Sequence, residues 1–72
     1  MRQYTVVLER AEDGTWGAYV PDLPGCTAGG ATMDEAKERI HLSIELWLEE
    51  MRSAGAIPPP PVAKSFEVSV AA

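Results

Sequence analysis

The stretch PDLPGC, residues 21–26, decides how this chain folds. Its two prolines lack an amide donor and bias the residue before each of them toward an extended conformation, so the stretch cannot continue a helix and suits a central strand poorly. Gly25 follows the second proline directly. The stretch therefore predicts a connector whose shape is largely fixed by its sequence, with separate elements of regular structure on either side.

Two segments before this connector have the alternation of β-strands. Residues 4–9 are rich in β-branched side chains, and their alternate positions from Tyr4 to Leu8 share one face. Residues 15–20 alternate in the same way. Between them, EDG at residues 12–14 is typical of a tight turn, because Asp-Gly readily adopts positive φ angles. The first twenty residues therefore predict a β-hairpin.

After the connector, the pattern predicts an amphipathic helix from about Met33 to about Ser53. Thr32 and Glu35 have the spacing of a capping box, in which each side chain satisfies a free amide at the helix start. Gly55 provides a natural stop. The broad apolar side of this helix consists of Met33, Ala36, Ile40, Ser43, Ile44, Trp47, Leu48 and Met51.

Four consecutive prolines, residues 58–61, predict a stiff extended spacer about 12 Å long. Beyond it, Phe66, Val68 and Val70 alternate with polar residues, so residues 65–70 are predicted to form a last strand. Such a strand lies at a sheet edge that must be covered or paired. We expect the three apolar side chains to form an interface between copies of the chain.

The predicted class is α+β, as a single domain over residues 1–72. Residues 26–31 are predicted as a short third strand or, because of the paired glycines, a loop. The order is then β-β-β-α-β, with one helix packed on a small, mostly antiparallel sheet. A chain of 72 residues buries only about 60% of its unfolded surface, so its core is marginal. The single Cys26 excludes an internal disulfide, and with the single His41 it argues against zinc, which leaves a homodimer or higher oligomer as the expected support.

The charge of the chain restricts its partners. Six Lys and Arg against eleven Asp and Glu give a formal charge of −5, which disfavours direct binding to nucleic acid. The N-terminus has no apolar signal core and no apolar run approaches the ~18 residues of a membrane span, so we expect a cytoplasmic protein without membrane contact. Acidity fits a basic protein partner, although many solvated domains are equally acidic.

Few residues suggest chemistry. The glycines lack the spacing of a phosphate-binding loop, and no cofactor is expected. His41 has no partner that would make it an acid or base, and we interpret it as a surface residue. Cys26 is interpreted as a small apolar side chain, with a nucleophile as the alternative if a base lies near. Asp22 alone has no evident structural role, although aspartate between prolines can shape a turn.

Leu42 and Leu46 lie one turn apart, outside the apolar side of the predicted helix. Isolated exposed leucines are common, so the pair has two interpretations: chance exposure, or a contact stripe for another protein. We expect a partner to bind the acidic and aromatic surface around four residues before the helix, with the leucine stripe as the second choice. Those four residues are Trp16, Tyr19, Asp22 and Leu23.

Three segments together resemble the HicB family of type II antitoxins: YTVVL at residues 4–8, DGTWGAYVPDLPGC at residues 13–26, and GATMDEA at residues 30–36. IELWL at residues 44–48 extends the match, which covers residues 4–60. The resemblance implies a partly degraded ribonuclease-H-like fold that binds and neutralises a HicA-type toxin, a small basic RNA-cleaving protein. Antitoxins of this family usually carry a C-terminal DNA-binding segment. Because this sequence stops at Ala72, we expect the short form without it.

The leading interpretation is therefore a non-enzymatic antitoxin. One alternative is a stand-alone oligomeric binding module with no toxin partner. The other is an enzyme, either a residual nuclease or a protein whose activity depends on Cys26. Ribonuclease H chemistry needs carboxylates that converge on metal ions, and the acidic residues of this sequence are scattered over turns and a helix start.

Overall fold

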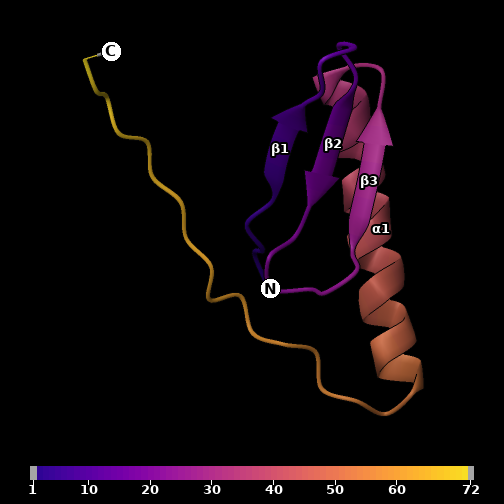
Figure 1. The fold of residues 1–72 in the computed structure, drawn as a ribbon. Helices are drawn as coiled ribbons and strands as arrows, with labels where there is room; N and C mark the ends of the chain where they lie inside the picture. Colours follow the sequence, from indigo (N-terminus) through magenta and orange to yellow (C-terminus); the bar gives the residue numbers. More distant parts are fainter. Residues whose placement is uncertain (1, 72) are drawn as a thin grey trace.

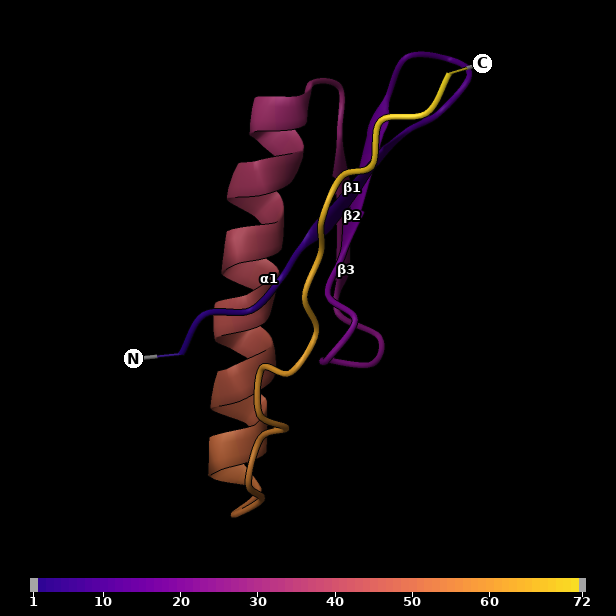
Figure 2. The ribbon, with the colours of Figure 1, turned by 90° about the vertical axis from the view of Figure 1, so that its left-hand side faces the viewer.

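The computed structural model describes residues 2–71, and in that range three β-strands precede one long helix. The elements are β1 (Val7–Arg10), β2 (Trp16–Tyr19), β3 (Thr27–Gly30) and α1 (Met33–Ser53). β2 lies between β1 and β3 and is antiparallel to both. α1 packs on one face of this sheet, and the other face is left uncovered (Figures 1 and 2). The predicted α+β class and the short third strand are confirmed.

The connector between β2 and β3 consists of two consecutive turns. The amide of Leu23 donates to the carbonyl of Val20 at 3.1 Å, and the amide of Cys26 donates to the carbonyl of Leu23 at 3.0 Å. Each turn has a proline in its second position, and Gly25, with a φ of +81°, occupies the third position of the second turn. This is the arrangement of a type II turn, which requires a positive φ at that point.

α1 has the bounds that its capping signals predict. Thr32 Oγ1 accepts a hydrogen bond from the Glu35 amide at 3.1 Å, and Glu35 Oε1 accepts one from the Ala31 amide at 3.1 Å. At the other end, the amide of Gly55 donates to the carbonyl of Arg52 at 3.0 Å. These bonds satisfy backbone groups that a helix leaves free at its ends, so both boundaries are set locally.

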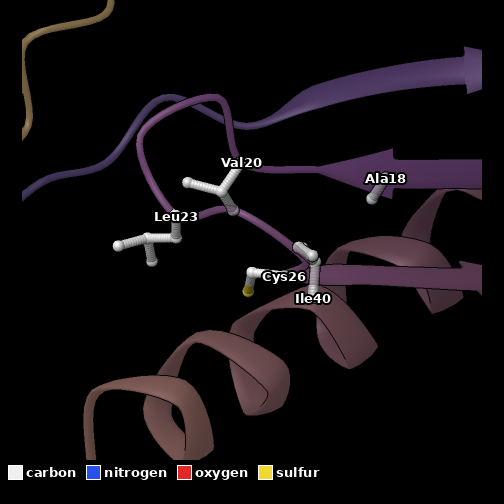
Figure 3. Packing of buried hydrophobic residues seen from close by; sticks show 5 residues of the cluster. All are labelled: Ala18, Val20, Leu23, Cys26 and Ile40. Carbon is white, nitrogen blue, oxygen red and sulfur yellow. The ribbon is translucent and has the colours of Figure 1, made fainter. Parts of the chain in front are cut away.

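The core lies between α1 and the connector end of the sheet (Figure 3). Leu23 is its only fully buried large side chain among the described residues, and Ile40 joins the same cluster from α1, beside Cys26. At the opposite end of β3, an added Cβ on Gly30 would lie 2.8 Å from the Ala36 amide nitrogen, so a side chain there would push the helix away. The cluster is Ala18, Val20, Leu23, Cys26 and Ile40, with Tyr4, Val6, Leu8, Ala28, Ile44, Trp47 and Leu48 packed around it.

The predicted last strand is wrong for this chain. Residues 65–70 form no strand, because they pair with no other strand among the described residues. The preceding segment is anchored through side chains instead: Tyr4 Oη donates to the Pro59 carbonyl at 2.6 Å, and Thr5 Oγ1 donates to the Ala63 carbonyl at 2.8 Å. Prolines cannot donate to a ladder, so the tetraproline run brings no backbone pairing with it.

The chain beyond Ala63 projects as an extended segment, residues 64–71, which we call the C-terminal arm. It runs along the β1 side of the sheet and in the direction of β1 (Figures 1 and 2). The radius of gyration is 13.9 Å, whereas a compact chain of this length would have about 11 Å. The arm is therefore the part that makes the molecule elongated.

Candidate partner-binding surface

The two leucines that stand out in the sequence lie on the outer side of α1. Leu42 is 61% exposed and Leu46 is 65% exposed. At about 100° per residue they project away from Ile40, which is buried against the sheet. Their position in α1 is thus set by the same helical phase that builds the core, and their apolar surface is available to another molecule.

Carboxylates surround this pair. α1 contains six acidic and three cationic side chains, a formal charge of −3 (3 − 6) for a helix in a chain of charge −5. Leu42 borders a shallow hollow with Glu38 and His41, and Leu46 borders a second one with Glu50. The outer side of α1 therefore combines an apolar centre with an acidic rim, which is the anatomy of many recognition surfaces.

Two close side-chain contacts, one of them an ion pair, hold part of this rim in place. His41 Nε2 lies 3.2 Å from Glu45 Oε1, and Arg52 Nε donates to Glu49 Oε2 at 3.0 Å. The hydrogen bond from Arg52, followed by the charge of its guanidinium, lowers the pKa of Glu49. Glu49 is therefore ionised at neutral pH. Because these pairs are exposed, each contributes little to stability, and their main effect is to orient the charges.

The two predicted aromatic contacts do not form one surface. Trp16 and Ala18 are two positions apart on β2 and so point to the same face of the sheet. Ala18 is buried on the face that α1 covers. Tyr19 has the opposite parity, so it lies on the uncovered face, where it is 41% exposed. The expectation of a continuous patch around both residues is corrected, because successive side chains of a strand point to opposite faces.

The two connector residues of the predicted patch have internal roles. Asp22 Oδ2 accepts hydrogen bonds from the amides of Val62 and Ala63, at 3.0 and 2.9 Å. Leu23 has no exposed surface, so its predicted place on a partner-binding surface is wrong. The reason is the double turn, which directs the side chain at the junction of the two turns into the core (Figure 3).

The remaining candidates for chemistry are placed as structural residues. Cys26 is buried in the core, and burial raises the pKa of its thiol, so the thiolate that a nucleophile requires is disfavoured. His41 is exposed on α1. The expected burial of Cys26 as a small apolar side chain and the expected surface position of His41 are confirmed. Within residues 2–71, no three His, Cys, Asp or Glu side chains gather in a position to hold a metal ion.

A family model described as HicB-like antitoxin of bacterial toxin-antitoxin systems matches residues 4–71. The chain belongs to the HicB-like antitoxin family. The resemblance seen in the sequence is thereby confirmed, and the match includes the hairpin, the connector, α1 and the C-terminal arm.

Several relatives of this HicB-like chain are UPF0150 proteins. One from Archaeoglobus fulgidus is 43% identical over 47 residues, which cover 65% of this chain and 68% of the relative. One from Synechocystis is 44% identical over 48 residues, or 67% of this chain and 61% of the relative. One from Thermoplasma acidophilum is 38% identical over 50 residues, or 69% of this chain and 72% of the relative. For the Synechocystis protein, the matched part is less than two thirds of its length.

Sequence interpretation missed the residues that anchor other parts of this HicB-like fold. Tyr4 and Thr5 hold the segment after the prolines, and Arg39 and Ser43 donate from α1 to carbonyls of β3. The only hint of these roles in the sequence is that each of the four side chains carries a hydrogen-bond donor and lies in or next to a predicted strand or helix. In the described part of the chain, no helix has both the length and the apolar character that a membrane span needs.

Proposed function

We propose that this protein is an antitoxin that binds and neutralises a small basic RNA-cleaving toxin of the HicA type. Membership of the HicB-like antitoxin family supports a toxin as the partner. The observation that carries the proposal at the level of residues is the outer side of α1, where Leu42 and Leu46 are exposed within an acidic rim. The function is binding, without catalysis by this chain.

The two leucines supply the apolar contact. Burial of such side chains against a partner removes apolar surface from water, at roughly 25 cal/mol per Å². The hollows beside Leu42 and Leu46 give the surface relief into which side chains of a partner can fit. We place the centre of the interface there, and Tyr19 and Trp16 remain proposed secondary contacts on the two faces of the sheet.

The carboxylates supply selectivity. A toxin that cleaves RNA presents cations where the phosphates bind, so a negative helix can occupy the same site. Opposite charges across an interface mainly raise the association rate and reject wrong partners. The ionised Glu49, held by Arg52, belongs to this rim. Neutralisation then follows from covering the surface that would otherwise bind RNA.

The proposal also includes the distant relation to a ribonuclease-H-like fold and a cytoplasmic location. Three antiparallel strands followed by a helix on one face support the first, and the family's place in bacterial toxin-antitoxin systems supports the second. Neither the proposed fold relation nor the proposed location implies that this chain is a nuclease.

The test is to mix the purified protein with any small basic HicA-type protein that is encoded beside its gene and to measure binding by calorimetry and RNA cleavage in the mixture. We expect a stable complex that suppresses cleavage, with an affinity that falls as salt rises. The double variant Leu42→Arg/Leu46→Arg should weaken binding by at least about 100-fold, which corresponds to about 2.8 kcal/mol.

Ile57→Arg is the matched control, because Ile57 is also a highly exposed aliphatic residue but lies beyond α1. This variant should bind like the parent chain, and circular dichroism should show that all variants keep their helix. Absence of a complex with the parent chain would refute the toxin as partner and favour the stand-alone module. A complex that the leucine variants bind equally well would refute α1 as the interface.

A further inference from the structure

The hollow beside Leu46 differs from the hollow beside Leu42 in the elements that form it. Leu42 borders its hollow together with Glu38 and His41, and all three belong to α1, so this one is a depression in the surface of a single helix. The hollow beside Leu46, which we call the connector hollow, lies between α1 and the segment where the connector passes into β3. From α1 it is lined by Ser43, Leu46, Trp47 and Glu50, and from the other side by residues 25–27.

Two hydrogen bonds hold the walls of the connector hollow together. Trp47 Nε1 donates to the carbonyl of Pro24 at 3.1 Å, and Ser43 Oγ donates to the carbonyl of Thr27 at 3.3 Å. The first bond joins α1 to the connector and the second joins α1 to β3, so the indole of Trp47 is held in place without a ligand. Walls that are already ordered lose little side-chain entropy when a partner binds.

The lining of the connector hollow combines apolar surface with one carboxylate. Leu46 and Trp47 supply the apolar surface, and Glu50 follows one turn later on the same side of α1. Glu50 is exposed, and within residues 2–71 no lysine, arginine or histidine forms an ion pair with it. Glu45 and Glu49, in contrast, each have a basic neighbour. The side chain that fits this hollow therefore has an apolar stem and a cationic head.

The size of the connector hollow restricts its occupant to a single side chain. Its volume is about 200 Å³, whereas pockets for small-molecule ligands usually have about 300–1,000 Å³. Arginine suits it better than lysine, because a planar guanidinium can stack on the indole of Trp47 and donate two N–H groups to the carboxylate of Glu50. The ammonium group of lysine carries the same charge, but it is more strongly hydrated and has no plane to stack.

We propose that the connector hollow receives an arginine side chain of the toxin, whose guanidinium lies between the indole of Trp47 and the carboxylate of Glu50. This inference rests on the proposed function and names the anchor of the same interface. Leu42 and Leu46 form the apolar contact beside the anchor, and arginine is among the residues that most often anchor interfaces. A protein that binds RNA presents arginines to the phosphates, so capture of such an arginine also withdraws it from RNA.

A titration of the free protein tests the connector hollow without the toxin. L-argininamide is added to the isotopically labelled protein, and the two tryptophan indole N–H signals are followed by NMR. We expect the Trp47 signal to shift in a saturable way, while the signal of Trp16, at the end of β2 away from the connector, stays in place. Lysinamide should cause a smaller shift at equal concentration, and glycinamide, which has the same α-ammonium group without a side chain, should cause none.

Glu50→Gln removes the negative charge of the connector hollow and keeps the shape of the side chain. It should weaken the binding of argininamide by at least about tenfold, because hydrogen bonds to an ionised group are the strong ones. Glu12→Gln is the matched control, since it removes one charge from an exposed residue in the turn between β1 and β2. This variant should bind like the parent chain. Equal shifts of Trp47 in all three proteins, or a Trp16 signal that shifts as much as Trp47, would overturn the proposal.

The same variants in the toxin complex separate this inference from the proposed function. Glu50→Gln should lower the affinity for the toxin by at least about tenfold, and Glu12→Gln by less than about twofold. Glu50→Arg should abolish binding, and replacement of one arginine of the toxin by glutamate should restore it. A complex that Glu50→Gln forms with the affinity of the parent chain would overturn the inference and leave the proposed function intact. Absence of any complex with the parent chain would refute the proposed function and with it the toxin as the source of the arginine, whereas the titration reports on the hollow independently.

Discussion

The sheet with α1 and the segment after α1 have a similar share of apolar residues, but they differ in how much of that apolar surface is buried. From β1 to the end of α1, most apolar side chains pack against one another around Leu23 and Ile40, and the exposed Leu42 and Leu46 are the main exceptions. After α1, Ile57, Phe66 and Val70 are among the most exposed apolar residues of the described chain. Alternation alone therefore does not make a strand, since a strand also needs a neighbour whose backbone is free to pair.

The contact between the two regions consists largely of side chains bonded to backbone. Asp22, Tyr4 and Thr5 hold the segment between Pro59 and Ala63. These contacts lie at the base of the arm, next to the connector and the start of β1. The packed region thus fixes where the arm begins, and the apolar side of the arm stays uncovered.

The largest effect is expected from breaking the packed region at Leu23. Leu23→Ala removes the fully buried large side chain of the core, and such a change costs about 2–5 kcal/mol. For a domain of this size, that is a large share of the total stability. Urea denaturation followed by circular dichroism at 222 nm should show a much lower midpoint, or a chain that is largely unfolded without denaturant.

Leu42→Ala is the matched control, because it removes the same atoms from an exposed position of α1. Its stability should stay within about 0.5 kcal/mol of the parent chain. Equal losses from both variants would contradict the assignment of Leu23 to the core and of Leu42 to a free surface.

A smaller and local effect is expected where the two regions meet. Asp22→Ala removes the carboxylate that accepts from the amides of Val62 and Ala63. Hydrogen bonds to a charged group contribute roughly 1.5–3 kcal/mol each. Amide exchange at these two residues, measured by NMR, should therefore accelerate by at least about tenfold, while exchange in the middle of α1 changes little.

Asp22→Asn keeps one acceptor oxygen at the same position but no charge, so its exchange rates should fall between those of Asp22→Ala and the parent chain. Exchange at Val62 and Ala63 that is the same in all three proteins would show that the carboxylate does not hold the segment.

Sequence patterns that act over a few residues predicted the packed region well. The capping residues Thr32 and Glu35 and the stop at Gly55 set α1, and the Pro-Gly pair set the second turn of the connector. These signals are local, because the group that needs a partner and the group that supplies it lie within a few positions of each other.

Contacts between distant parts of the chain could not be predicted in this way. Asp22 bonds to residues 40 and 41 positions away, and the only trace in the sequence was a carboxylate without a local role. Leu23 was expected on an acidic and aromatic partner-binding surface, whereas the orientation of this one side chain depends on how two turns combine. On α1, the stripe of Leu42 and Leu46 followed from helical phase, so this part of the candidate site was accessible from the sequence.

The smallest expected effect concerns the turn between β1 and β2, inside the packed region. Asp13 Oδ1 accepts from the Thr15 hydroxyl at 2.7 Å and from the Thr15 amide at 3.0 Å. These bonds, the hydroxyl first, lower the pKa of Asp13. A carboxyl whose pKa is lower in the folded state adds stability above its unfolded pKa, and this contribution is lost as pH falls through the folded pKa. The turn should therefore loosen on acidification below about pH 4.

Thr15→Val removes the hydroxyl donor and keeps the amide, so the pKa of Asp13 should rise toward its ordinary value without returning fully. An NMR titration of the side-chain carboxyl carbons measures this shift directly. Thr5→Val is a suitable control, since it removes a hydroxyl that bonds to Ala63 and belongs to the anchor of the arm. If both variants raised the pKa of Asp13 equally, the turn and the anchor of the arm would be coupled. That result would contradict the division of the molecule into a packed region and a separately tethered arm.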